Sequence, residues 1–422
     1  MRILRHSDAD FSTALATLKR HAEASPQVRE TVAKVLHAVR TEGDSALLEF
    51  TERFGGPRLT AQQLRVTGRA RVAPATRDAL VIARANVLAF ARKSLRASWT
   101  MKNAQGGAVG ERFDPFRRVG IYVPGGTAPL VSTAVMTVTL AAAAGVPEIV
   151  VTTPSGADGK VNDALRFALE FCGATEIYRA GGAQAVAALA YGTETIAPVQ
   201  KIFGPGNAYV VEAKRQVFGQ VAIDLLPGPS EILVLADASA NPAWIAADLL
   251  AQAEHGTGSA ILFVTNSAKL LKAVEAQLAA QLATLSRQEQ LAGVLADGCA
   301  LILVKTLREA VAIANDFAPE HVSVVTKEDE KIAAQLSTSG AIFLGGYSPV
   351  AAGDFLAGPS HTLPTGGAGR SFPGLTVDMF QRRTSIVQLS AQALRKSVPT
   401  IAKFSEIEGL DAHGRSAAIR FE

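Results

Sequence analysis

The sequence has few of the features that mark a secreted or membrane protein. Only two cysteines, Cys172 and Cys299, occur among its 422 residues. Two thiols cannot build a disulfide scaffold, and they fit a reducing compartment. The N-terminus becomes polar within a few residues, and the most apolar stretch, residues 134–146, is too short to span a bilayer. We therefore expect a soluble cytoplasmic protein without a signal peptide.

Aromatic residues and net charge are also scarce. Aromatic residues make up 6% of the chain, and the formal net charge is +4. Basic residues come in isolated pairs such as Arg117-Arg118, without interleaved aromatics, so we expect no nucleic-acid partner. The hydrophobic share of 48% and the charged share of 19% are those of an ordinary globular protein. A chain of this length can form two or more domains.

From residue 119 onward, short apolar segments alternate with stretches of helical periodicity, whereas the preceding part reads as helices over 8–21, 26–40 and 77–95. Such alternation predicts parallel sheets with covered faces. We expect two α/β blocks, roughly 119–231 and 232–370, with the N-terminal helices packed on one of them. The expected strands are 119–123, 148–152, 176–179, 201–203, 232–235, 260–264, 301–304, 321–325 and 341–344. The last segment, 411–420, reads as a strand or an extended arm.

Three glycine-rich loops, 124–127, 181–184 and 204–207, each follow an expected strand and precede a helix. A helix N-terminus can hold a phosphate, and ligands of open parallel sheets bind at the carboxyl ends of the strands. One such loop alone is most often an ordinary turn. Three in series, with Gln184 and Asn207 at helix starts, favour a nucleotide or phosphate ligand. The G-x-G-x-x-G and G-x-x-x-x-G-K-[ST] fingerprints are absent.

A second group of residues has the chemistry of metal ligands. Gln252 and His255 lie three residues apart at the end of a helix that begins at Asn241-Pro242. Alone, such a pair is usually a solvated helix end. Asp354, in the long glycine- and proline-rich segment 353–367, and His413 would complete a mixed nitrogen and oxygen set. That set suits Zn²⁺ and also accepts Mn²⁺ or Co²⁺, although spacing along the chain does not show that the four meet.

Glu320 and His321 form a third candidate site at a junction between a helix and a strand. A carboxylate and an imidazole are the usual partners for moving protons near neutral pH. Standing alone, the pair would more often be a surface pair at a strand edge.

Taken together, these segments resemble the histidinol dehydrogenase family over nearly the whole chain. Seven blocks in family order carry the resemblance: 118–126, 181–185, 201–207, 228–231, 252–255, 319–321 and 353–365. The resemblance implies a zinc- and NAD-dependent enzyme that oxidises L-histidinol through L-histidinaldehyde to L-histidine, the last steps of histidine biosynthesis. It also implies a homodimer with shared active sites, in which the C-terminal arm crosses to the partner.

The resemblance further assigns roles to individual residues. It implies Gln252, His255, Asp354 and His413 as ligands of one zinc ion per subunit, and Glu320 and His321 as the acid/base pair. Substrate contacts are implied for Ser230, His361 and Glu408, together with His321 and the four metal ligands, and NAD contacts for Tyr122, Gln184 and Asn207. Within a homodimer, Glu408 and His413 would complete the neighbour's site.

Two alternatives stay open at this stage. A related zinc and NAD enzyme could oxidise another polar alcohol, such as a sulfonated diol. A zinc hydrolase with Glu320 as base is weaker, because four protein ligands leave no position for a water on the metal.

With the resemblance, we expect an α/β fold of two Rossmann-like parallel-sheet domains with N-terminal helices and a small C-terminal arm domain. The expected division is an N-terminal helical extension (1–25), a first α/β domain with the metal and catalytic residues (26–118 plus 232–375), a second α/β domain on the NAD side (119–231), and a dimer-crossing arm (376–422).

Overall fold

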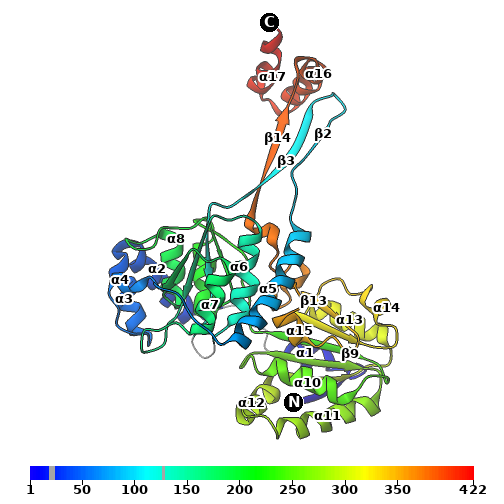
Figure 1. Ribbon diagram of the computed structural model, residues 1–422. Coiled ribbons are helices and arrows are strands. Elements are labelled where there is room, and N and C mark those ends of the chain that lie inside the picture. The colour runs from blue at the N-terminus through cyan, green and yellow to red at the C-terminus, as the bar shows by residue number, and fades with distance from the viewer. Residues whose placement is uncertain (19–23, 126–128) are drawn as a thin grey trace.

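The computed structural model describes residues 1–18, 24–125 and 129–422. Two α/β bodies, each built on a parallel sheet, lie next to each other, and a long arm that ends in helices rises from them (Figure 1). This arrangement confirms the predicted fold class, two parallel-sheet domains with a C-terminal arm.

The first body is organised around a six-stranded sheet, sheet A, with the order β1-β11-β10-β9-β12-β13. All its neighbouring strands are parallel. Helices cover both faces, as buried parallel strands require. The strands are β1 (Arg2–Arg5), β9 (Glu231–Ala236), β10 (Ala260–Thr265), β11 (Cys299–Leu303), β12 (His321–Val325) and β13 (Ala341–Leu344). The helices are α10 (Pro242–Ala253), α11 (Ala268–Leu282), α12 (Gln288–Gly298) and α15 (Val350–Phe355) on one face and α1 (Phe11–Ala16), α13 (Leu307–Phe317) and α14 (Asp329–Ala333) on the other.

The second body is organised around a five-stranded parallel sheet, sheet B, with the order β6-β5-β4-β7-β8. Counted along the chain, this order is that of a doubly wound sheet whose winding reverses between β4 and β7, where such sheets bind ligands. The strands are β4 (Arg118–Tyr122), β5 (Glu148–Thr153), β6 (Glu176–Arg179), β7 (Lys201–Phe203) and β8 (Ala222–Ile223). One face carries α5 (Pro74–Ser94), α6 (Val131–Ala143) and α7 (Asp163–Cys172), and the other carries α2 (Pro26–Glu42), α3 (Asp44–Arg53), α4 (Ala61–Leu64), α8 (Gly182–Tyr191) and α9 (Ala208–Val217).

The N-terminal segments pack differently from the predicted division. Residues 26–94, which the division groups with 232–375, place their apolar stripes in the two cores of sheet B. Val32, Val35 and Val39 of α2, for example, are buried against α8 and α9. Residues 2–5, expected to lie in a helical extension, instead form β1 and add a parallel edge strand to sheet A. An amphipathic stripe predicts that a helix is buried, but it does not identify the surface that covers it.

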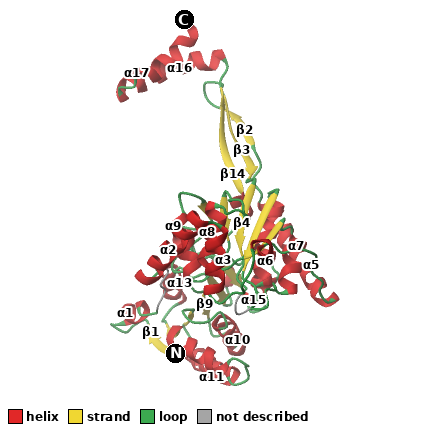
Figure 2. Ribbon diagram, turned by 90° about the vertical axis from the view of Figure 1, so that its left-hand side faces the viewer, coloured by secondary structure: helices red, strands yellow, loops and turns green. Residues whose placement is uncertain are grey.

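The arm is a three-stranded antiparallel sheet, of which β2 (Trp99–Lys102) and β3 (Ala108–Pro115) form a hairpin and β14 (Gln381–Gln388) pairs with β3. Two helices, α16 (Ala391–Glu408) and α17 (Asp411–Ala418), sit at its far end, away from both bodies (Figure 2). The prediction of a strand or extended segment over 411–420 is therefore wrong. Helix α17 packs against α16, the helix directly before it in the chain, and the sequence pattern of 411–420 did not reveal this contact.

Other boundaries also differ from the sequence-based expectations. The first helix covers Phe11–Ala16, and residues 19–21 of the expected helix 8–21 lie outside the described residues. The segment 353–367 is not wholly irregular, because α15 extends to Phe355 and includes Asp354. Short 3-10 turns occur at Ala368–Arg370, Val377–Phe380 and Ile419–Phe421.

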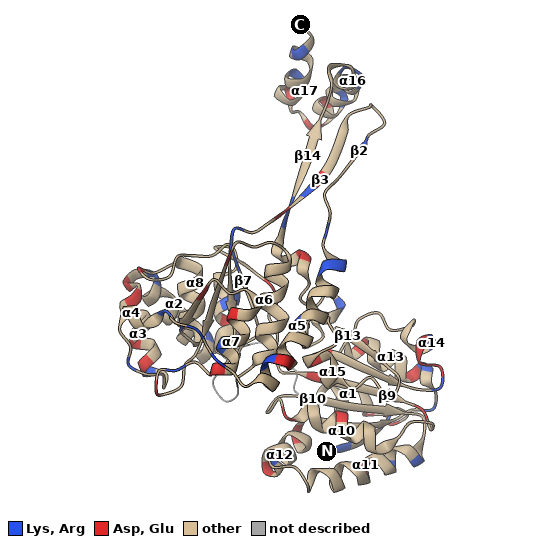
Figure 3. Cartoon of the chain, viewed as in Figure 1, with Lys and Arg blue, Asp and Glu red and all other residues tan. Residues whose placement is uncertain are grey.

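Charged residues of both signs are interspersed over the two bodies and the arm (Figure 3). In the described part of the chain, no helix is both long enough and apolar enough to cross a membrane.

Candidate active site

The paired acid and base lie where two central strands of sheet A begin. His321 is the first residue of β12, and Glu231 is the first residue of the neighbouring strand β9. Glu320 precedes β12 and Ser230 precedes β9, so the four residues gather at the amino edge of the sheet. This edge is opposite to the carboxyl edge at which ligands of such sheets usually bind.

Glu320 is almost fully buried, with 5% of its surface exposed. Its Oε2 accepts hydrogen bonds from the Ser230 hydroxyl at 2.7 Å and from the Glu231 backbone N–H at 2.9 Å. Burial raises the pKa of Glu320 to about 8, and these two donors only partly oppose the rise. The carboxyl group is therefore poised to gain or lose a proton near neutral pH, as a general acid or base must.

The His321 ring is held in one tautomer by the backbone. Its Nδ1 lies 2.9 Å from the Glu231 carbonyl oxygen, which can only accept, so Nδ1 carries the proton. Its Nε2 is therefore an unprotonated base, and it lies 4.0 Å from Asp354 Oδ1. Burial lowers the pKa of His321, which keeps the ring neutral and able to accept a proton.

Glu231 was not singled out from the sequence, yet it organises this edge. The residue is 2% exposed, and its carboxylate accepts hydrogen bonds from the backbone N–H groups of Glu320 at 3.3 Å and Gly366 at 2.9 Å. Its backbone also supplies the contacts to Glu320 and His321 described above. A carboxylate at the start of the otherwise apolar strand β9 is the signal in the sequence that could have identified it.

Three of the four predicted metal ligands come from segments that meet near His321. Gln252 lies in the last turn of α10, and His255 follows in the turn after the helix, where its N–H donates to the Gln252 carbonyl at 3.3 Å. The side chain of Asn241 caps the start of this helix, as predicted. The Gln252 side chain is 2% exposed, and both its amide oxygen and its amide nitrogen lack a hydrogen-bond partner.

His361 joins the same cluster from the segment after α15. Its Nδ1 lies 3.1 Å from the Asp354 carbonyl oxygen, and its Nε2 lies 3.3 Å from the hydroxyl of Thr133 on α6. Burial lowers the pKa of His361 to about 4, so the ring is neutral. Because Thr133 belongs to the second body, this contact links the two bodies at the site.

The remaining two predicted site residues lie elsewhere in the chain. His413 on α17 and Glu408 at the end of α16 are exposed at the tip of the arm, far from His255 and Asp354 on the bodies. Among the described residues, no three His, Cys, Asp or Glu side chains come together as a metal site. Of the four predicted metal ligands, Gln252, His255 and Asp354 thus lie on the first body, and His413 lies on the arm.

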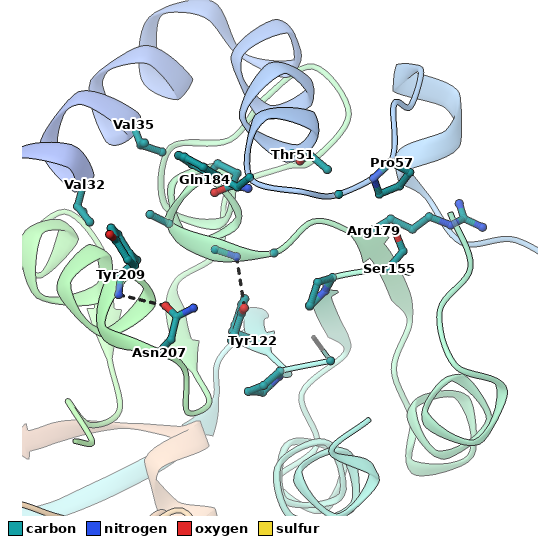
Figure 4. Close-up of a pocket in the computed structure, with 18 of the residues that line it drawn as sticks. Val32, Val35, Thr51, Pro57, Tyr122, Ser155, Arg179, Gln184, Asn207 and Tyr209 are labelled. Carbon is teal, nitrogen blue, oxygen red and sulfur yellow. Dashed lines mark hydrogen bonds between the residues drawn. The ribbon is translucent and has the colours of Figure 1, made fainter. Parts of the chain in front are cut away.

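The predicted NAD residues line one cavity of about 570 Å³, here called cavity I, at the carboxyl edge of sheet B. Tyr122, Gln184 and Asn207 surround it (Figure 4). The Gly182 N–H donates to the Tyr122 hydroxyl at 3.3 Å, and Asn207 Oδ1 caps α9 by accepting from Tyr209 N at 3.1 Å. Gln184 is 2% exposed, and its Oε1 lacks a partner. Gly126 of the first glycine-rich loop lies outside the described residues.

A second cavity of about 520 Å³, cavity II, lies between the two bodies. Asn207 lines it from the second body, and Ser230 and His255 line it from the first. Because Asn207 lines both cavities, cavities I and II adjoin at this residue.

Comparisons with known proteins agree on one family. The sequence model of the family described as histidinol dehydrogenase matches residues 18–421. Proteins named histidinol dehydrogenase are 45% identical in Syntrophotalea carbinolica, over 100% of this chain and 99% of that protein, and 45% identical in Geobacillus kaustophilus, over 96% and 97%. The crystal structure of histidinol dehydrogenase from Elizabethkingia anophelis superposes with a TM-score of 0.94 at 32% identity, covering 100% of this chain and 98% of that one.

Proposed function

The chain belongs to the histidinol dehydrogenase family, and from this premise we propose that it oxidises L-histidinol through L-histidinaldehyde to L-histidine with two molecules of NAD. The observation that carries the proposal is the placement of Glu320 and His321. The two side chains form a buried acid/base pair beside Ser230, which lines the cavity that adjoins cavity I. A dehydrogenase that forms an acid from an alcohol needs such a pair twice, once for each oxidation.

In the first oxidation, His321 Nε2 accepts the proton of the substrate alcohol while the carbon releases its hydride. The tautomer set by the Glu231 carbonyl leaves Nε2 free for this role. Since burial lowers the pKa of His321, the ring starts neutral and can take up the proton.

In the second oxidation, Glu320 removes a proton from water as the water adds to the aldehyde carbon. The resulting hydrate then releases a second hydride and becomes the carboxylic acid. Ser230 and the Glu231 N–H both bind Glu320 Oε2, so Oε1 is left to accept the proton of the water. The protons leave through Glu320 and His321, and the overall change is a four-electron oxidation of the alcohol.

Cavity I fits NAD. It lies at the carboxyl edge of sheet B, where the winding reverses, and doubly wound sheets bind dinucleotides at this position. The Oε1 of Gln184 has no hydrogen-bond partner and supplies an acceptor inside the cavity. Tyr122, Gln184 and Asn207 are the residues that we propose contact the coenzyme. When bound, NAD supplies the acceptor for the hydride in each oxidation.

The donors at the site also fit zinc. Gln252 has a buried amide oxygen without a partner, an arrangement that is costly in a folded chain unless a ligand or a metal satisfies it. Gln252, His255 and Asp354 would hold the ion together with the partner subunit's His413, a mixed nitrogen and oxygen set of the kind that zinc accepts. When bound, zinc supplies an anchor that orients the substrate.

A homodimer with shared active sites would bring His413 and Glu408 to the site of the neighbouring chain. The arm supports this proposal, since it extends away from both bodies (Figure 2). Its end also exposes large apolar side chains. Phe404, Ile407 and Leu410 are 60%, 69% and 40% exposed, which is unfavourable unless another surface covers them. In the dimer, Ser230, His361 and Glu408 would contact the substrate.

The test is a spectrophotometric assay of NADH formation with the purified protein, NAD and L-histidinol. We expect two NADH per histidinol consumed, with L-histidine as the product. No reduction of NAD by histidinol would contradict the proposal. Rapid reduction with a sulfonated diol instead would assign the chain to another activity, although no comparison favours that alternative or the zinc hydrolase.

A further inference from the structure

A second charged pair is buried in the second body, away from the acid/base pair. Lys214 on α9 and Asp224, which follows β8, form an ion pair whose side chains are both 0% exposed. Taking two charges out of water carries a large desolvation cost, and such a pair is weak evidence for stability by itself. We therefore looked for a reason for the pair in the other groups that the two side chains bind.

Both side chains bind the backbone of the same residue, Gly204. Lys214 Nζ donates to the Gly204 carbonyl at 2.9 Å, and the Gly204 N–H donates to Asp224 Oδ2 at 2.7 Å. The ion pair thus satisfies both the backbone N–H and the backbone carbonyl of Gly204, at the point where β7 ends. Asp224 Oδ1 also accepts from the Leu225 N–H at 2.6 Å.

Gly204 allows β7 to approach β4 closely at Tyr122, which lines cavity I. It has a φ of +107°, and a Cβ at this position would collide with the carbonyl oxygen of Tyr122. The end of β7 is therefore pressed against the end of β4, where the winding of sheet B reverses. Three residues later the same loop ends at Asn207, so the pair holds the loop that carries Asn207 in contact with Tyr122.

Asp224 also anchors a second segment that leads to the site. The connection from sheet B to sheet A starts at Leu225 and reaches Ser230 and Glu231, which bind Glu320. Asn207 and Ser230 both line cavity II. One buried ion pair thus ties down both the loop on the coenzyme side and the connection on the acid/base side.

We propose that Lys214 and Asp224 are positioning residues that align the Asn207 loop with Tyr122 for coenzyme binding and hold the connection to Ser230 in register with it. The inference rests on the proposed function, since it concerns NAD. Neither residue touches substrate or coenzyme, and each acts through the backbone that it binds.

The test is the double variant Lys214→Met/Asp224→Asn, which has no charge and so leaves none buried without its partner. It retains an acceptor for the Gly204 N–H but removes the donor to the Gly204 carbonyl. Because the loss of one or two net hydrogen bonds is worth about a factor of ten in an equilibrium, we expect KM for NAD to rise about tenfold. KM for histidinol should rise less than KM for NAD, because Gln252, His255 and Asp354 are untouched and only Ser230 is reached through the connection that starts at Leu225.

The matched control is a second ion pair at the opposite end of the same sheet. Arg118, at the start of β4, donates two hydrogen bonds to Glu176 at 2.8 and 2.9 Å, far along the strand from cavity I. The variant Arg118→Met/Glu176→Gln should lower the midpoint of thermal unfolding and leave KM for NAD unchanged. A general loss of stability would move both variants alike, whereas a positioning role moves KM for NAD only in the first.

The double variant Lys214→Gln/Asp224→Asn also leaves no charge buried, keeps a donor on the side that faces the Gly204 carbonyl, and serves if the first double variant does not fold. We expect a smaller rise, about threefold, in KM for NAD. An unchanged KM for NAD in a folded Lys214 or Asp224 variant would overturn the inference. A wild-type protein that does not reduce NAD with histidinol would overturn the proposed function instead, so the two failures are distinguishable.

Discussion

The Thr133 hydroxyl oxygen lies 3.3 Å from His361 Nε2, and this contact joins α6 of the second body to the segment that follows α15 in the first. The Asp354 carbonyl accepts from Nδ1 of the same ring, which leaves Nε2 as an acceptor and Thr133 as the donor. The ring that is proposed to contact histidinol is thus oriented from both bodies at once.

We predict that Thr133→Val raises KM for histidinol about threefold to tenfold, because it removes the donor to His361 and costs about one net hydrogen bond. Thr133→Ser retains the hydroxyl and should behave like the wild type. Thr137→Val, one turn further along α6, removes a hydroxyl that binds only the Thr133 carbonyl, at 2.6 Å. Steady-state kinetics of the three variants test the prediction, and equal effects at Thr133 and Thr137 would argue against it.

A pH dependence follows from Glu320. Burial raises the pKa of Glu320 to about 8, so the carboxyl is protonated at neutral pH and becomes a base only as the pH rises. We predict that the rate of histidinaldehyde oxidation increases with pH up to about 8 and then levels off. Glu320→Gln should reduce this rate by about a hundredfold or more and abolish the rise. Its thermal stability should not fall, since the substitution removes a carboxyl group whose ionisation is disfavoured by burial.

The sequence predicted the local structure around the candidate site residues better than the contacts between distant segments. The glycine-rich loops 181–184 and 204–207 lie at one edge of sheet B, because the carboxyl ends of parallel strands share an edge. The caps and apolar stripe of α10 likewise placed Gln252 correctly at its end. Local patterns of this kind are sufficient to predict structure that depends on contacts between residues a few positions apart in the sequence.

Contacts between distant parts of the chain could not be predicted in this way. Strand β3 pairs with β14, which lies more than two hundred residues later, so the arm sheet had no local signature. The docking of α2 and α5 on sheet B depends on shape complementarity, which an amphipathic stripe does not encode. Thr133 and Lys214 became recognisable only when the fold brought them to His361 and Gly204.

Gln252 allows a test of the metal proposal that does not depend on activity. We predict that Gln252→Leu lowers the zinc bound per subunit, measured by atomic emission, from about one to well below one, because it removes a ligand. In metal-free protein the same variant should be more stable by about 1–3 kcal/mol, since a buried amide without partners is lost.

The matched control for this test is Gln184→Leu, which removes the other buried amide with an unpartnered oxygen. It should leave the zinc content unchanged and raise KM for NAD. A Gln252 variant that still binds one zinc with unaltered affinity would contradict the assignment of this residue as a ligand.

Acid stability should depend on Glu176. Its hydrogen bonds with Arg118 hold the pKa of Glu176 at about 2, below the ordinary value of 4.5. A carboxylate with a lowered pKa contributes stability that is fully present above pH 4.5 and is lost as the pH falls towards 2. Because the pair is partly open to solvent, we expect a contribution of about 1–3 kcal/mol. Urea unfolding of the wild type and of Glu176→Gln should give a difference at pH 7 that shrinks at pH 3.

The shared site predicts complementation between two inactive subunits. His413→Ala removes the ligand on the arm, whereas His321→Ala removes the base on the body, so each homodimer should be inactive. In a mixed dimer, the intact arm of the second variant meets the intact body of the first, and one of the two sites is complete.

Random reassociation gives mixed dimers in about half of the molecules, so we expect about a quarter of wild-type activity after mixing. The measurement is NADH formation after co-refolding of equal amounts of the two variants. The control is a mixture of His321→Ala with Asp354→Ala, both of which alter the body, so no mixed dimer has a complete site. If the first mixture is as inactive as the control, each site is built within one chain, and the arm must then fold back on its own body.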